Sequence, residues 1–300
     1  MKKGLLFIFA LGAFVSTAIQ AAAQPPTNSP PPKVLSIFRE DVKASRTGAH
    51  EKLEAGYVAA LRKANWPVFS IALTPVAGPN DAWFINAYDS FEAMEKDRRA
   101  IDKNAELSRE FERLDALDAD FRTNQRGFVA FLREDLSYHP TIDLAQIRYF
   151  EIITLRARPG HDSEFGEAAK AIRAAFEKKN SPEDHFAIFQ VEAGLPAGTY
   201  FVFIPMKSLR EIDRNLSPEN QQAFMKAFGE SGFKKFEKLV ADSLLSEEVA
   251  IYAISPKMSY VSKEFAAAGG DFWKPSFAAR PVAVKKPAAA PKPAEKKAQQ

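Results

Sequence analysis

The chain of 300 residues contains no cysteine. This absence excludes disulfides, thiol catalysis, Cys-ligated zinc and iron–sulfur clusters, and the lipid-carrying cysteine of a bacterial lipoprotein. Phosphate-binding glycine loops, a Gly-x-Ser-x-Gly elbow and a His-Glu-x-x-His pair are absent as well. The net charge is only +3, and the basic excess lies at the two ends, which leaves the region 34–262 mildly acidic. Such a body is a poor candidate for nucleic-acid binding.

The N-terminal residues have the pattern of a secretory signal peptide. Lys2 and Lys3 precede an apolar run over residues 5–15, and small residues follow up to Ala23. We expect cleavage after Ala23 and export to the periplasm or the extracellular space, the alternative being an uncleaved N-terminal anchor. Residues 24–33 are predicted to form an extended Pro-rich leader.

The C-terminal residues 263–300 are rich in Ala, Pro and Lys. Such a composition buries little apolar area, so we expect a disordered tail. Two interpretations stay open: a solubilising tail, or a cationic tether to an anionic envelope polymer or membrane surface.

An internal repeat organises the region between the two ends. The sequence around Phe69 and Gly78 recurs around Phe186 and Gly194, and matching positions continue on both sides. The further matches are Phe38 with Phe150, Gly48 with Gly160, Trp83 with Tyr200, Ser90 with Ser208, and Ser137-Tyr138 with Ser259-Tyr260. We therefore predict two copies of one unit, repeat 1 over residues 34–140 and repeat 2 over residues 141–262.

Each copy shows the same succession of hydrophobic periods. A strand (34–42 or 147–155) is followed by a helix, a hairpin, a long helical region and a final strand (128–132 or 249–254). This β-α-β-β-α-β order predicts a ferredoxin-like α+β unit. The strands are apolar on both faces, so we expect the two repeats to pack sheet to sheet as an intramolecular α/β barrel.

In element order and duplication, residues 34–262 resemble a tandem member of the dimeric α/β-barrel superfamily. Within it, the chain resembles the exported NIPSNAP-like and antibiotic-biosynthesis-monooxygenase-like proteins. The resemblance implies a ligand site between sheet and helices or between the sheets. Haem-using relatives need a correctly placed histidine, and no histidine here lies in a recognisable haem motif, so no haem ligand is carried over.

Polar residues that interrupt apolar strands are the candidate ligand-binding positions. Asn86 shares a strand face with Phe84 and Tyr88, whereas the second copy has apolar residues at the matching positions. Asn86 could equally be satisfied by nearby backbone. Arg39, Glu151 and Arg148 lie on the first strands of the two copies; they are candidates for holding an anionic ligand or for a structural ion pair.

The histidines and carboxylates suggest no metal site. His50 and His161 both fall near a helix start, which could make them a pseudo-symmetric pair, but we expect a helix start to be exposed. Asp115, Asp118 and Asp120 are predicted to lie on a solvated helix face. The run Arg39-Glu40-Asp41 is interpreted as a polar strand exit. We therefore expect neither a metal nor a cofactor, and no catalytic residue is assigned.

Three functions remain open at this level. The leading one is a monomeric, exported small-ligand-binding module that accepts a small hydrophobic ligand. Its rival is a cofactor-independent monooxygenase on an aromatic substrate, in which Asn86 and Tyr88 would orient a substrate anion. The third is a structural or tethering protein of the cell envelope.

Overall fold

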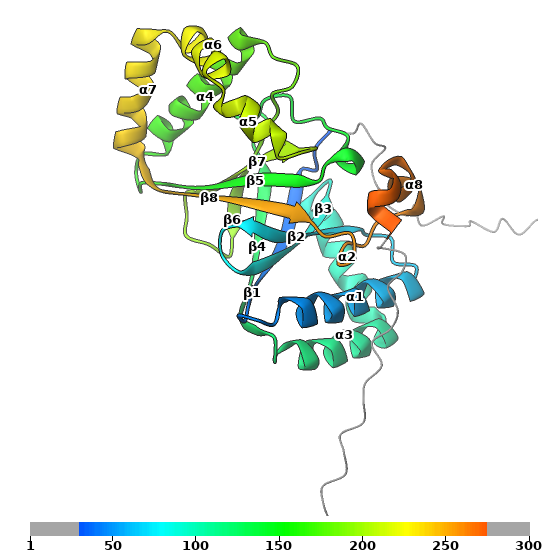
Figure 1. The fold of residues 1–300 in the computed structure, drawn as a ribbon. Coiled ribbons are helices and arrows are strands. Elements are labelled where there is room, and N and C mark those ends of the chain that lie inside the picture. The colour runs from blue at the N-terminus through cyan, green and yellow to red at the C-terminus, as the bar shows by residue number, and fades with distance from the viewer. Residues whose placement is uncertain (1–29, 275–300) are drawn as a thin grey trace, which may run out of the picture.

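The computed structural model describes residues 30–274, and its centre is a closed antiparallel barrel of eight strands (Figure 1). Around the barrel the strand order is β1-β3-β2-β8-β5-β7-β6-β4, and β4 pairs again with β1. The strands are β1 (Val34–Val42), β2 (Ser70–Ala77), β3 (Asp81–Tyr88), β4 (Arg122–Leu132), β5 (Tyr149–Ala157), β6 (Ala187–Ala193), β7 (Thr199–Met206) and β8 (Leu244–Ile254). This mixed α/β architecture is consistent with the dimeric α/β-barrel fold.

Helices cover the barrel in two separate layers (Figure 1). The first layer holds α1 (Thr47–Lys63), α2 (Phe91–Lys103) and α3 (Ala105–Asp118); the second holds α4 (Asp162–Lys179), α5 (Arg210–Leu216), α6 (Pro218–Phe228) and α7 (Glu230–Ser243). Ser90 and Ser217 cap the N-termini of α2 and α6: their side chains accept hydrogen bonds from the backbone amides of Ala93 and Asn220. Among residues 30–274, no helix is long and apolar enough to cross a membrane.

The inside of the barrel is packed with side chains. Alternate residues of each strand point inward, and the largest fully buried one is Trp83, whose ring lies at 5.4 Å from those of Phe201 and Tyr252. Leu73 and Ile152 belong to the same core. The expected strands are confirmed in place, although β4 and β8 begin several residues earlier than the apolar pattern indicates. The N-terminal part of each strand is largely exposed and contains a polar run, residues 122–126 in β4 and 246–248 in β8, which interrupts the apolar pattern.

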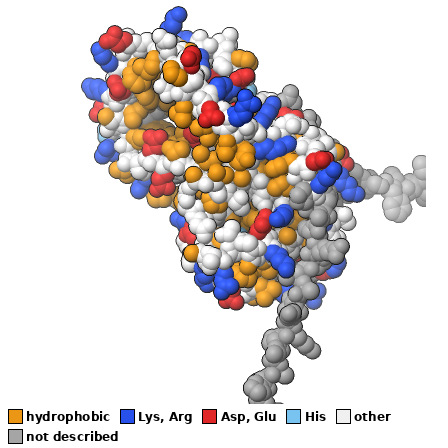
Figure 2. Space-filling view, in the orientation of Figure 1, with side chains coloured by type: hydrophobic (Ala, Val, Ile, Leu, Met, Phe, Trp, Pro, Cys, Tyr) orange, Lys and Arg blue, Asp and Glu red, His pale blue; other side chains and the backbone are white. Residues whose placement is uncertain are grey.

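The outer wall between the two helical layers is less covered. Val76 of β2 and Val249 of β8 are 50% and 56% exposed, and the two strands are neighbours in the barrel. Figure 2 shows hydrophobic side chains gathered over this wall, with charges of both signs around them.

The structure of residues 263–274 contradicts the expectation of a disordered tail from residue 263 onward. Residues 263–274 are not disordered: they form α8 (Lys263–Ala268) and a 3₁₀ turn (Gly270–Trp273) that pack against the barrel. Trp273 is completely buried, and its indole N–H donates to the carbonyl of Ala145 at 3.0 Å. The aromatic side chains of residues 263–274 supply the buried apolar area, which the Ala, Pro and Lys content of residues 263–300 as a whole did not indicate. The remainder of the expected tail, the leader up to residue 29 and the signal-peptide region lie outside the described residues.

Candidate metal centre

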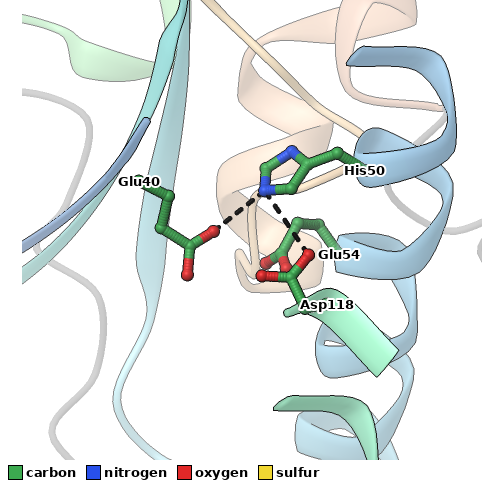
Figure 3. A group of neighbouring side chains, drawn as sticks. All are labelled: Glu40, His50, Glu54 and Asp118. Carbon is green, nitrogen blue, oxygen red and sulfur yellow. Dashed lines mark hydrogen bonds and ion pairs between the residues drawn. The ribbon is translucent and has the colours of Figure 1, made fainter. Parts of the chain in front are cut away.

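Four ionisable side chains meet between the outer face of the barrel and the first helical layer. They are Glu40, His50, Glu54 and Asp118, and each offers one ligand atom within 4.8 Å of the others (Figure 3). We call this set the carboxylate–histidine cluster.

Three separate elements bring the cluster together. On β1, residues alternate between the two faces, so Glu40 points to the helices while its neighbour Arg39 points into the barrel. On α1, His50 and Glu54 are four residues apart and therefore share one helix face. Asp118 is the last residue of α3.

All four side chains are buried. The exposed fractions are 5% for Glu40, 2% for His50, 6% for Glu54 and zero for Asp118. Three expectations from sequence are therefore wrong: His50 is not exposed at a helix start, Asp118 is not on a solvated face, and Glu40 is not a polar strand exit. In each case the packing of α1 and α3 against β1 covers a residue whose local sequence is polar.

The hydrogen bonds leave part of the cluster without partners. Nε2 of His50 lies 2.9 Å from a carboxylate oxygen of Glu40 and 3.8 Å from one of Asp118. Because an ionised carboxylate only accepts, the histidine donates to Glu40. Within residues 30–274, the carboxylate oxygens of Asp118 accept no hydrogen bond of regular geometry, although one of them forms an ion pair with Arg122. The Glu54 carboxylate forms neither a hydrogen bond nor an ion pair within the same residues.

A guanidinium lies beside the cluster. Arg122, the first residue of β4, approaches Glu40 at 2.7 Å and Asp118 at 3.1 Å, and its other terminal nitrogen binds Asp115. Glu40 and Asp118 thus share a single guanidinium, and the third buried carboxylate, Glu54, has no ion pair within residues 30–274. Such an excess of buried negative charge is unfavourable unless a proton or a further cation neutralises it.

The pKa values reflect this excess. Burial, together with the charges of Glu40 and Asp118, raises the pKa of Glu54 well above its ordinary value. Burial and the charge of Glu40 raise the pKa of Asp118 to about 6. The cluster accordingly has the donor atoms, the burial and the unbalanced charge that a divalent cation requires.

The residues predicted from sequence lie elsewhere. Phe84, Asn86 and Tyr88 alternate with the inward-facing Trp83 and Ile85, so they share the outer face of β3, as expected. The hydroxyl of Tyr88 donates to Asp97 at 2.7 Å, and the indole of Trp66 donates to the other oxygen of Asp97 at 2.9 Å.

Arg39, Arg148 and Glu151 are not brought together. Arg39 points into the barrel, where it pairs with the buried Asp81. Arg148 donates to the carbonyls of Ala145, Ile147 and Gly269, so it anchors the segment that contains α8. Glu151 is half-buried on β5, and burial raises its pKa. Nε of Arg39 and both terminal nitrogens of Arg148 are thus engaged by the protein itself, while ligand binding by this set remains a prediction.

A weak signal for the cluster was present in the sequence. His50 and Glu54 lie at i and i+4 among the apolar positions Leu53, Tyr57 and Val58 of one helix, where exposed residues would not be expected. Glu40 and Asp118 had no such signal, because 78 residues separate them in the chain.

Among known proteins, the fold of this chain is similar to that of several solved structures. No family model and no curated protein matches the chain. An anthrone oxidase-like protein is 13% identical, with a TM-score of 0.49, and the match covers 74% of this chain and 91% of that one. A proposed monooxygenase from Lactobacillus acidophilus NCFM is 9% identical (TM-score 0.45), covering 74% of this chain and 94% of that one.

A third similar structure is a mutant chlorite dismutase from Candidatus Nitrospira defluvii, in complex with cyanide. It is 9% identical, with a TM-score of 0.42, and the match covers 79% of this chain and 95% of that one. At TM-scores below 0.5 and such low identities, none of these similarities assigns an activity to this chain. The narrower NIPSNAP-like resemblance stays a prediction.

Proposed function

We propose that this protein binds one divalent transition-metal ion through Glu40, His50, Glu54 and Asp118. The observation that carries the proposal is the convergence of four buried ligand atoms within 4.8 Å of one another, with the Glu54 carboxylate lacking any hydrogen bond or ion pair within residues 30–274. Metal–ligand bonds of about 2.1 Å place opposite ligands at most about 4.2 Å apart. The side chains therefore need to move by only a fraction of an ångström to close around an ion.

The donor set indicates the class of metal. Carboxylate oxygens suit Mg²⁺, Ca²⁺ and Mn²⁺, whereas imidazole suits Zn²⁺, Fe²⁺ and related ions. Three carboxylates with one imidazole, and no thiolate, favour Mn²⁺, Fe²⁺ or Zn²⁺. Since the four ligands come from β1, α1 and α3, the bound ion would also join the first helical layer to the barrel.

Metal titration of the purified, chelator-treated protein tests the proposal. We expect one equivalent of Mn²⁺, Fe²⁺ or Zn²⁺ to remain bound after gel filtration, measured by elemental analysis. Replacement of two ligands (His50→Ala with Glu54→Gln) should abolish this binding. His161→Ala is the matched control, because His161 lies at the start of α4 in the second half and its side chain is 39% exposed. Wild-type protein that retains none of the three metals would contradict the proposal and leave the cluster as a buried proton and ion-pair network.

Two further features of the molecule remain proposals. We infer that the barrel consists of two ferredoxin-like repeats, supported by the matching order β4-β1-β3-β2 in the first half and β8-β5-β7-β6 in the second. We also propose that the protein works after export, on the basis of residues 1–23. The mass of the protein recovered from cell fractions tests export: a cytoplasmic protein with an intact N-terminus would contradict it.

The hydrophobic ligand and the cofactor-independent monooxygenase have less support. The barrel interior is filled by its own aromatic side chains, including Trp83, Phe128 and Phe201. A ligand of either kind would therefore bind outside the barrel, beside the helices.

A further inference from the structure

Arg122 is the charged group that sets the electrostatic balance of the carboxylate–histidine cluster. Its guanidinium contacts Glu40 at 2.7 Å and Asp118 at 3.1 Å, and its side chain is only 12% exposed. Because the interior screens charges weakly, this fixed positive charge acts on any ion in the cluster more strongly than a surface charge would.

The charges can be counted from the side chains that face the cluster. Glu40, Glu54 and Asp118 contribute three negative charges when ionised, Arg122 contributes one positive charge, and a metal-bound imidazole is neutral. A divalent ion neutralises the remainder completely, whereas a trivalent ion leaves one buried positive charge. Buried uncompensated charge is costly.

We propose that Arg122 makes this centre selective for the divalent state of its metal and disfavours the trivalent state. The inference rests on the proposed function, because it concerns the same cluster. The neighbouring Asp115 weakens the selectivity only slightly, since its side chain is 57% exposed and water screens its charge.

Removal of the positive charge should therefore favour a trivalent ion. In Arg122→Met the four ligands are retained, but the cluster becomes more negative by one unit. At a separation of about 5 Å and an effective dielectric constant of about 20, the Coulomb interaction shifts the ratio of trivalent to divalent ion on the order of 100-fold.

Iron is the probe, because both oxidation states are accessible. The protein is loaded anaerobically with Fe²⁺, and the ratio of Fe³⁺ to Fe²⁺ is measured spectroscopically in redox buffers, which supply or accept the single electron that separates the two states. We expect Arg122→Met to shift the ratio toward Fe³⁺ at every potential. Arg122→Lys, which keeps the positive charge, should stay close to the wild type.

Two further variants separate a charge effect from damage to the fold. Arg126 lies on the same strand as Arg122 but pairs with Asp41, outside the cluster. Arg126→Met should therefore leave the ratio of Fe³⁺ to Fe²⁺ unchanged. Asp115→Asn removes an exposed negative charge and should shift the ratio a few-fold in the opposite direction, toward Fe²⁺. This variant provides the test even if Arg122→Met does not fold.

The possible outcomes are distinct. One equivalent of iron with ratios that follow the charge changes supports the inference. If all variants bind iron equally well but the ratio of Fe³⁺ to Fe²⁺ is the same in the wild type, Arg122→Met and Asp115→Asn, the inference is overturned and the proposed function stays intact. If wild-type protein holds no Fe²⁺, Mn²⁺ or Zn²⁺, the proposed function and this inference fail together.

Discussion

At the scale of single residues, the proposed metal binding by the cluster would conflict with the stability of the metal-free protein. Glu54 is buried, has no hydrogen-bond partner among the described residues and has a raised pKa. Its ionised form therefore costs stability in the absence of a cation.

We expect Glu54→Gln to stabilise the metal-free protein by roughly 1 kcal/mol at neutral pH, since it replaces a buried carboxylate by a neutral side chain of the same shape. The same substitution should weaken metal binding at least about tenfold. Chemical denaturation with and without Zn²⁺ measures both effects. A metal-free variant that is markedly less stable than the wild type would show that the carboxylate is stabilising.

The raised pKa of Asp118 predicts how the metal-free protein responds to pH. Folding raises this pKa from 3.8 to about 6 through burial and the charge of Glu40, so in this interval the folded state binds more protons than the unfolded state. Stability contributed by Asp118 is therefore present below pH 3.8 and is lost as the pH rises to about 6.

Comparison of wild type with Asp118→Asn isolates this contribution. The difference in unfolding free energy between the two proteins should change between about pH 4 and about 6, with the wild type losing stability relative to the variant. Denaturation curves at several pH values, recorded with a chelator present, measure the difference. A difference that stays constant over this interval would contradict the shifted pKa.

At the scale of elements, the segment 263–274 should contribute strongly to stability. Trp273 is fully buried against Phe265 and donates to the carbonyl of Ala145, and Arg148 holds the carbonyl of Gly269 at 3.0 Å. We expect Trp273→Ala to destabilise the protein by about 3–5 kcal/mol.

Thermal unfolding measures this effect, and Lys274→Ala is the control, because the exposed side chain of Lys274 forms a single ion pair within residues 30–274, with the exposed Asp271. Equal melting temperatures for the two variants would show that the segment is not part of the core.

The helices and strands also show which features of the fold could be predicted from the sequence alone. Alternation in the strands and turn residues such as Gly78 located both hairpins, because these signals lie within a few consecutive residues. The buried state of Glu40 and Asp118 could not be predicted in this way, since it depends on the packing of α3 against α1 and of α1 against β1. The helix that begins at Lys263 was missed for a related reason: its segment contacts residues 145–148, more than 110 positions earlier.

At the scale of the whole molecule, the barrel closes within one chain. Both junctions between the halves, β2 with β8 and β4 with β6, are paired internally, so residues 30–274 leave no barrel strand without two neighbours. We therefore expect a monomer, of about 33.3 kDa if the chain is unprocessed. Light scattering coupled to gel filtration measures the mass, and a stable dimer at micromolar concentration would contradict this expectation.

The junction between β2 and β8 also has a consequence for biosynthesis. Leu73 pairs with Ile254, and Ser70 with Tyr260, across more than 180 residues of chain. While a ribosome is still adding the last part of the chain, β2 has no outer neighbour and the apolar inner face of the first half has nothing to pack against. The barrel can therefore close only after residues 251–260 have been synthesised, which makes closure a late step in the folding of this protein.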